Sequence, residues 1–321
     1  MKKLVAISFS DLHINNWQTK YRYDGDRLSD SIAPLTYLDL LAINKGVPLL
    51  FSGDLFHKPR SLDSEIIELA ISKLSNLHSK IIGIDGNHDQ RKPNTHKNPV
   101  KGYNEILSMV VPNMTCLTPD IYYNNGNFVV HGIPYLKHNV GFKYYLGRIK
   151  KNLSKDLPNI LLIHTDLPGA ITENGTSLGD VDNIRLNMFK EFDLVLCGHI
   201  HKPQVIRKGI VMVGAPYQQN LGDIGQERGY WEIYDDMSYK FIPLNNICPT
   251  YKRYNPDNEP KYPKQHIYVP KIKPTSIIKG STKQFSTSND RVSIAKAYLK
   301  TTKQKDKSKG SLLINLIKTN A

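Results

Sequence analysis

Five apolar runs in this chain each lead into aspartate, asparagine or histidine, and this repetition constrains the fold more than any other feature. In one of them, residues 80–84 predict a buried strand, and Gly86-Asn87-His88-Asp89 follow it. Open α/β sheets bind ligands where their strands end, so polar side chains at that position indicate a site. By itself the tetrapeptide is more simply a polar turn opened by Gly86. Its recurrence in related form at four other strand ends favours a site.

The candidate ligands follow predicted strands at residues 4–10, 48–52, 80–84, 159–163 and 193–197. They are Asp11, His13, Asp54, Asn87, His88, His164, His199 and His201. Asp11 and His13 are two positions apart, as are His199 and His201, and such side chains point to the same side of an extended segment. Imidazole together with carboxylate suits manganese, iron or zinc better than calcium or magnesium. These ligands are too many for one metal ion and predict two ions bridged by one carboxylate. Such a pair of ions promotes in-line displacement at phosphorus.

Helical periodicity separates these strands. It predicts helices over residues 31–44, 63–79, 140–153 and 183–192, with a further helix over 100–111. Alternating strands and helices predict a layered α/β domain with two mixed β-sheets flanked by helices. We expect residues 205–213 and 229–244 to form strands of the second, more antiparallel sheet. The composition changes near residue 245, so we predict a domain over 1–245 and a small basic C-terminal extension.

The positive charge of the chain lies almost entirely at its C-terminal end. The formal net charge is +14, and residues 251–321 hold 16 Lys and Arg against 4 Asp and Glu, a net charge of +12. Such asymmetry indicates a polyanionic partner, most simply nucleic acid. The alternative is a solvated lysine-rich tail that has no partner.

Three widely spaced cysteines form neither a disulfide framework nor a zinc pattern, which indicates a reducing compartment. The apolar run at residues 4–7 is too short for a signal peptide, and no stretch approaches the length of a membrane span. We therefore expect a cytoplasmic protein without a membrane partner.

The order of these motifs resembles that of the calcineurin-like metallophosphoesterases over about residues 4–245. The motifs are Asp-x-His, Gly-Asp, Gly-Asn-His-Asp, a lone His and Gly-His-x-His. Within that superfamily the chain is similar to the SbcD-type DNA repair and recombination nucleases, a group that includes phage recombination endonuclease subunits. Residues 53–57, Gly-Asp-Leu-Phe-His, followed by Arg60, match the nuclease form and not that of the protein Ser/Thr phosphatases. Residues 214–233 contain Gly-Ala-Pro-Tyr-Gln, Leu-Gly-Asp and Gly-Tyr-Trp-Glu-Ile, which resemble the segment after Gly-His-x-His in those nucleases.

The resemblance implies a layered metallophosphoesterase sandwich with two divalent metal ions, for which we expect Mn²⁺. The implied ligands are Asp11, His13 and His201 for one ion, Asn87, His164 and His199 for the other, and Asp54 as the bridge. The resemblance also implies that His88 orients the phosphate and can protonate the leaving oxygen, and that His57 approaches the substrate phosphate. Asp166 follows His164 by two positions, which by itself indicates a site residue only weakly.

The resemblance further implies that the chain cuts DNA as the catalytic subunit of a complex with an SbcC-type coiled-coil ATPase. It also implies a homodimer, for which residues 63–79 and 100–111 are the matching segments. The alternative is a small-molecule or nucleotide phosphodiesterase on the same scaffold. A DNA-binding scaffold without chemistry is disfavoured, because no ligand position is substituted.

The C-terminal extension departs from the nuclease pattern, because residues 246–285 leave room only for a reduced version of the usual DNA-capping domain. The candidate DNA-binding residues there are Lys252, Arg253, Lys261, Lys264, Lys271 and Lys273. Tyrosines lie between them, which suits phosphate contact and base stacking as well as an ordinary basic segment. We predict that residues 286–321 form short helices that bind the ATPase, since such segments cannot bury their own apolar faces.

Overall fold

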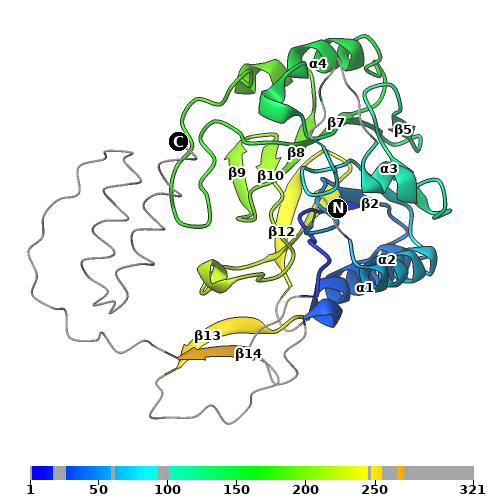
Figure 1. Ribbon diagram of the computed structural model, residues 1–321. Helices are drawn as coiled ribbons and strands as arrows, with labels where there is room; N and C mark the ends of the chain where they lie inside the picture. Colours follow the sequence, from blue (N-terminus) through cyan, green and yellow to red (C-terminus); the bar gives the residue numbers. More distant parts are fainter. Residues whose placement is uncertain are drawn as a thin grey trace, which may run out of the picture. The chain divides into compact units, whose positions relative to one another are not determined.

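The computed structural model describes residues 2–16, 27–58, 62–92, 95, 101–244, 247–254 and 266–270. All of them belong to one compact unit, Met1–Lys271. Two six-stranded mixed β-sheets pack against each other, and α-helices lie on their outer faces (Figure 1). The layered α/β fold expected from the sequence is therefore confirmed. The predicted C-terminal helices in residues 286–321 lie outside the described residues, as does Arg60.

The first sheet combines a parallel half with an antiparallel half. Its order is β12 (Tyr239–Pro243), β11 (Gly229–Tyr234), β1 (Leu4–Phe9), β2 (Leu49–Phe51), β3 (Ile81–Gly83) and β4 (Met114–Cys116). Strands β1 to β4 are parallel, whereas β11 pairs antiparallel with both β1 and β12.

The second sheet has a parallel centre with antiparallel edges. Its order is β5 (Tyr123–Asn124), β6 (Val129–Ile133), β7 (Asn159–His164), β8 (Leu194–Gly198), β10 (Ile210–Met212) and β9 (Gln204–Arg207). Strands β6, β7, β8 and β10 are parallel, and β5 and β9 pair antiparallel at the two edges. A separate parallel pair is formed by β13 (Thr250–Tyr254) and β14 (His266–Pro270).

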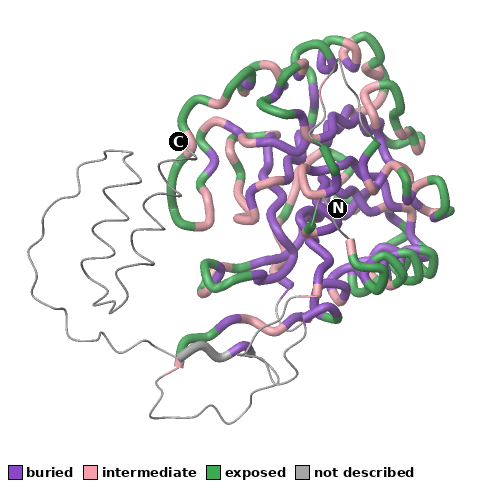
Figure 2. The backbone as a smooth tube through the Cα atoms, viewed as in Figure 1, coloured by how far each residue is buried: buried purple, intermediate pink, exposed green. Residues whose placement is uncertain are grey.

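The alternation of side chains along each strand explains the layers. In β2, Leu49 and Phe51 pack with the core beneath helices, whereas Leu50 belongs to the core between the sheets. In β7, Leu161 lies beneath the helices of the second sheet, and Leu162 faces the inter-sheet core. Both faces of these strands are buried, as parallel strands between two layers require (Figure 2).

Helices cover the outer face of each sheet, and no helix in the described part of the chain is long and apolar enough to cross a membrane. The α-helices are α1 (Leu28–Lys45), α2 (Ser64–Ser75), α3 (Tyr103–Leu107) and α4 (Phe142–Lys150). The 3₁₀ helices are η1 (Lys137–Asn139), η2 (Leu186–Phe189) and η3 (Leu221–Asp223). Helices α1 and α2 contribute to the core of the first sheet, and α4 contributes to that of the second (Figure 1).

Two expectations about secondary structure are wrong. Residues 229–244 do form strands, but β11 and β12 extend the first sheet beside β1 instead of joining the second. Strand β11 pairs with the open edge of β1, although the two strands are separated by most of the chain in sequence. Local sequence does not encode such a pairing. The helix expected over 183–192 is reduced to η2. Asn183, in a left-handed conformation with φ of 61°, donates from its side-chain amide to the carbonyl of His138 and favours a loop.

A buried arginine attaches β13 to the body of the fold. Arg27 is 1% exposed, and its Nε donates to Asp30 Oδ2 at 3.1 Å. Its Nη1 donates to the hydroxyl of Tyr251 on β13 at 2.8 Å, and its Nη2 donates to the carbonyl of Gln218 at 2.8 Å. The side chain of Gln218 in turn accepts from the backbone N–H of Tyr251 at 2.7 Å. The guanidinium therefore joins the start of α1, the 218–219 loop and the C-terminal segment.

Replacing Arg27 with methionine should lower the free energy of unfolding by about 3–5 kcal/mol, because it removes one partner of the buried ion pair between Arg27 and Asp30. Urea unfolding followed by circular dichroism measures this. The control is Arg207→Met, at an exposed position of β9, which should change stability by less than about 0.5 kcal/mol. Equal stabilities of the two variants would contradict a stabilising role for Arg27.

Candidate metal centre

The parallel strands of both sheets deliver polar residues to one region. In the first sheet β1, β2 and β3 are parallel, and in the second β7 and β8 are parallel. The residues at or after their carboxyl ends are Asp11, Asp54, Asn87, His164 and His199. Their side chains approach within hydrogen-bonding or ion-pair distance of one another, so the two sheets share one site.

One group of candidate ligands consists of Asp11, His13 and His201. The Nε2 atoms of His13 and His201 are 3.1 Å apart. Oδ1 of Asp11 lies 3.9 Å from Nε2 of His13 and 4.0 Å from Nε2 of His201. One donor atom of each residue therefore faces the same small volume, as a shared cation requires.

The second group consists of Asn87, His164 and His199. Oδ1 of Asn87 lies 3.0 Å from Nε2 of His164 and 2.9 Å from Nδ1 of His199. Nδ1 of His164 lies 2.7 Å from the carbonyl of Ser52, which can only accept, so this nitrogen carries the proton. In the neutral ring Nε2 of His164 is then the unprotonated nitrogen, and it faces the group as a metal ligand must.

Asp54 stands between the two groups. Its Oδ2 lies 3.6 Å from Nε2 of His13 and 3.3 Å from Nε2 of His164. Its Oδ1 accepts the backbone N–H of His88 at 2.7 Å, which fixes the orientation of the carboxylate. A single oxygen of Asp54 therefore reaches both groups, the position of a bridging ligand.

The donor atoms fit a pair of divalent cations. Ligand atoms at about 2.1 Å from a cation stand about 3.0–3.5 Å apart in octahedral or tetrahedral geometry. The separations around Asn87, from 2.9 to 3.0 Å, and around Asp54, from 3.3 to 3.6 Å, are close to that range. One ligand group offers two imidazoles and an amide oxygen, and the other offers two imidazoles and a carboxylate. Together with the shared carboxylate, these donors suit divalent transition metals.

Three of the four groups at the centre of the site have the charge state that a bound cation needs. Burial lowers the pKa of His13 well below its usual value, and burial together with His164 lowers that of His199 to about 3, so both rings are neutral at pH 7. Burial opposes the charged form of His164, but Asp54 raises its pKa to about 9. Although burial opposes its ionisation, the pKa of Asp54 is held below its usual value by His164 and His13. Metal binding requires neutral imidazoles around an ionised carboxylate, so His164 must give up its second proton when a cation binds.

Backbone strain is concentrated at these ligands. Asp11, His13, Asp54 and His199 have φ of 53°, 49°, 61° and 99°, in the left-handed region that non-glycine residues rarely adopt. Each such residue costs about 1–3 kcal/mol and persists only where its surroundings hold it. The backbone N–H of Asp11 donates to the carbonyl of Gly53 at 2.9 Å, and that of His13 donates to the carbonyl of Asp54 at 3.0 Å. The two ligand loops therefore hold each other in place.

Asp89 supports the loops without lying among the ligands. Its carboxylate accepts the backbone N–H groups of Asp54 at 2.7 Å, Leu55 at 2.9 Å and Gly86 at 2.9 Å. It also accepts the side-chain amide of Asn104 at 2.9 Å. The last residue of the Gly-Asn-His-Asp motif therefore joins the loop after β2 to the loop after β3.

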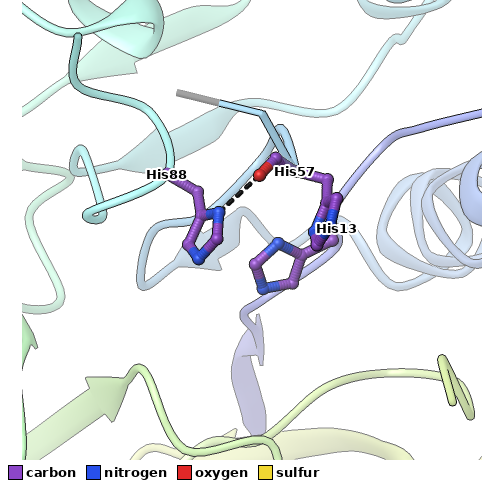
Figure 3. A group of neighbouring side chains, drawn as sticks. All are labelled: His13, His57 and His88. Atoms are coloured by element: carbon purple, nitrogen blue, oxygen red, sulfur yellow. Dashed lines mark hydrogen bonds between the residues drawn. The ribbon is translucent and has the colours of Figure 1, made fainter. Parts of the chain in front are cut away.

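His13 of the first ligand group also forms a cluster with His57 and His88 (Figure 3). Nδ1 of His88 hydrogen-bonds the carbonyl oxygen of His57, and the two rings stack with centroids 5.4 Å apart. The ring centroid of His13 lies 4.8 Å from that of His88 and 5.3 Å from that of His57. Burial and the neighbouring His88 lower the pKa of His57 to about 4. The structure thus brings both predicted catalytic histidines to the ligands.

Several residues that support the ligands leave little or no signal in the sequence. Oδ1 of Asp166 lies 3.5 Å from Nε2 of His199, so it can orient the ring whose Nδ1 faces Asn87. Glu173 accepts the backbone N–H of His201 through Oε1 at 2.5 Å. Nε2 of Gln219 donates to the carbonyl of Asp11 at 2.6 Å. Spacing from His164 gave a signal for Asp166, whereas Glu173 and Gln219 act on backbone groups and left none.

The candidate DNA-binding residues are described only in part. Lys252 and Arg253 are exposed on β13, next to the buried Tyr251. Lys261, Lys264, Lys271 and Lys273 lie outside the described residues. Contact with DNA therefore stays a prediction.

Comparison with a family model identifies the family of this chain. A known crystal structure aligns with 76% of this chain and 100% of its own length, at 13% sequence identity and a TM-score of 0.47. A family model described as calcineurin-like phosphoesterase matches residues 7–203. The matched range spans Asp11 to His201 and so contains every candidate ligand. The chain belongs to the calcineurin-like phosphoesterase family.

Proposed function

We propose that this chain is a DNA nuclease of the SbcD type that uses two Mn²⁺ ions. Its family consists of metal-dependent phosphoesterases, and the position of Asp54 carries the proposal for two ions. One carboxylate oxygen lies 3.6 Å from the first ligand group and 3.3 Å from the second. When bound, two such ions neutralise the charge that develops on phosphate oxygens during in-line displacement.

The side chains around the ions have distinct tasks in this reaction. The backbone N–H of His88 holds Oδ1 of Asp54, so Oδ2 keeps its place between the ligand groups. The side chain of His88 donates from Nδ1 to the carbonyl of His57, which fixes its ring and leaves Nε2 for the substrate. We assign His88 to orient the phosphate and, with a second proton on Nε2, to protonate the leaving oxygen. The stacked ring of His57 supports this face of the site.

Several observations support DNA as the substrate. The Gly-Asp-Leu-Phe-His sequence at residues 53–57 resembles that of the nuclease group. The exposed Lys252 and Arg253 lie on β13, whose Tyr251 is hydrogen-bonded to Arg27 and to the Gln218 side chain. The residues from 251 onward carry a net charge of +12, which suits a polyanion.

The test is cleavage of linear duplex DNA by the purified chain in the presence of Mn²⁺ and at several salt concentrations. A nuclease that neutralises several phosphates should lose affinity steeply as salt rises, because binding releases counterions. A small-molecule phosphodiesterase, the second candidate, should show little slope and should leave duplex DNA intact.

Replacing His88 with alanine should reduce DNA cleavage by about a hundredfold to ten-thousandfold, the usual contribution of a general acid or base. The chain should still bind two metal ions, because His88 is assigned to the phosphate and not to a cation. Metal analysis of the purified variant and its cleavage rate measure the two effects. Loss of an ion would place His88 among the ligands and contradict the assignment.

We also propose that residues 286–321 bind a coiled-coil ATPase of the SbcC type and that the chain forms a homodimer. The apolar residues at 312–317 and the lysine-rich spacer before them support the first proposal. For the dimer, Ile67 and Ile71 on α2 are 39% and 38% exposed.

Deletion of residues 286–321 should abolish co-purification with the ATPase while hydrolysis of a small phosphodiester remains at the level of the full chain. The reason is that the ligands and their supports lie within residues 11–219. A shortened chain that loses small-substrate hydrolysis would show instead that this segment belongs to the catalytic body.

A further inference from the structure

The 217–228 segment, which lies between β10 and β11, holds the loop after β1 through two buried side chains. Nε2 of Gln219 donates to the carbonyl of Asp11 at 2.6 Å, and the hydroxyl of Tyr217 donates to the carbonyl of Leu12 at 3.1 Å. Two consecutive carbonyls of the loop are thereby fixed. These bonds oppose relaxation of the strained backbone at Asp11, whose φ is 53°.

The same segment supports His201 through one intermediate residue. Nε2 of Gln226 donates to the carbonyl of Glu173 at 2.9 Å, and the carboxylate of Glu173 accepts the backbone N–H of His201. Together with the bonds to the loop after β1, this contact fixes the backbone at or beside every ligand of the first group.

The second ligand group has other supports. The carbonyl of Ser52 lies 2.7 Å from Nδ1 of His164, and Oδ1 of Asp166 lies 3.5 Å from Nε2 of His199. Within the part of the chain that the structure describes, no hydrogen bond joins the 217–228 segment to a ligand of this group. The segment therefore acts directly on one ligand group and not on the other.

A buried ion pair keeps the segment itself in place. Oδ2 of Asp223 accepts the backbone N–H of Gln219 at 2.7 Å and that of Asn220 at 3.2 Å. Its Oδ1 accepts Nη2 of Arg228 at 2.6 Å, and both charged residues are buried. Breaking such a pair leaves a buried charge uncompensated, which is costly. The side chain of Gln219 is therefore presented to Asp11 from a fixed position.

We propose that the 217–228 segment sets the affinity of the first ligand group for its metal ion, with Gln219 and Tyr217 as positioning residues, while the second ion is bound independently of it. This inference rests on the proposed function with two Mn²⁺ ions. Residues that orient metal ligands typically contribute a factor of about 10–100 in metal affinity. Because the reaction needs both ions, the segment determines the Mn²⁺ concentration at which the chain becomes active.

Replacing Gln219 with methionine removes the donor to Asp11 and keeps the length of the side chain. The dissociation constant of the first Mn²⁺ ion should rise at least about tenfold. Asp11 contacts the second group through the backbone N–H of His199 at 3.1 Å, which binds no metal, so the second constant should change less than about threefold. Titration of the metal-free chain, with free Mn²⁺ followed by electron paramagnetic resonance, measures both. His201→Ala and Asn87→Ala, which each remove a ligand from one group, identify the two binding steps.

Two further variants separate positioning from folding. Tyr217→Phe removes only the hydroxyl that donates to Leu12, and it should weaken the first binding step by a factor of about 2–10. It decides the question alone if Gln219→Met does not fold. The control is Asn113→Leu, which removes a side-chain amide that donates to the carbonyl of Leu77 at 2.8 Å. Asn113 directly precedes β4, at the end of the sheet opposite the ligands, so both binding steps should stay unchanged.

Hydrolysis of a small phosphodiester gives a second readout. The Mn²⁺ concentration for half-maximal rate should rise at least about tenfold in Gln219→Met, and excess Mn²⁺ should restore most of the turnover. Equal weakening of both binding steps, titrations unchanged from the unaltered chain, or a loss of turnover that excess Mn²⁺ does not restore would each overturn the inference. If the unaltered chain binds fewer than two Mn²⁺ ions, the proposed function fails as well. If it binds two and the variants weaken both steps equally, only the role of the segment is wrong.

Discussion

Replacing Asp54 with asparagine should abolish metal-dependent hydrolysis while the fold stays intact. Oδ2 of Asp54 lies 3.3 Å from Nε2 of His164 and 3.6 Å from Nε2 of His13, so both ligand groups depend on this charge. Asparagine keeps the size of the side chain, and its Oδ1 can still accept the N–H of His88. The loss of the shared negative charge should cost several kcal/mol in the transition state, a fall in kcat of at least about ten-thousandfold.

Turnover of a small phosphodiester with Mn²⁺, together with metal content and thermal unfolding, measures this effect. The control is Asp156→Asn, an equivalent change at an exposed loop position, which should retain full turnover and both ions. If Asp54→Asn kept the turnover of the unaltered chain, the two-metal assignment would be wrong. Loss of secondary structure in this variant would mean that the carboxylate is needed for folding as well.

Replacing Gly86 with alanine should inactivate the chain as completely as the Asp54→Asn change, although Gly86 has no side chain that could take part in the reaction. A Cβ atom at Gly86 would overlap Oδ1 of Asp54 and would lie 2.5 Å from the backbone nitrogen of the same residue. The added methyl group must therefore displace the shared carboxylate or separate the loops after β2 and β3. Either shift moves a ligand by a distance comparable with 1 Å, which alone costs about a hundredfold, and it also removes the bridge between the ions.

The matched control is Gly147→Ala, because a Cβ atom there meets no heavy atom within 4 Å. Alanine inside α4 should raise stability by about 0.5–1 kcal/mol and leave turnover unchanged. Metal content and turnover distinguish the two variants. A Gly86→Ala chain with two bound ions and full activity would show that the loops can separate without moving Asp54.

The candidate ligands were predictable because their positions follow from local sequence. Asp11 and His199 each follow an apolar strand directly, and parallel strands bring their carboxyl ends together in any open α/β fold. The spacing of two positions between His199 and His201 also indicated that these two ligands come from the same segment. Short apolar runs predicted the strands. Helical periodicity predicted α1, which the structure places at Leu28–Lys45.

The parts that the sequence did not predict depend on long-range contacts. The placement of β11 beside β1 rests on a pairing such as Leu4 with Tyr234, which no local pattern reveals. The role of Gln219 rests on a hydrogen bond to a backbone carbonyl, and any residue type carries that carbonyl. Glu173 lies in a loop without periodicity and acts on the backbone of His201. Such residues are identified by the contacts that they make in the folded chain, not by their neighbours in sequence.

The sharing of ligands between the two sheets has a consequence for the order of folding. His13 and His201, whose ring nitrogens are 3.1 Å apart, are separated by 188 positions in the chain. A cation bound between them closes a loop almost as long as the domain, as a covalent cross-link would, and it does so only after both sheets have packed. Metal binding therefore cannot assist the earliest stages of folding. Metal binding acts late in folding, because it slows the separation of the two sheets after they have packed.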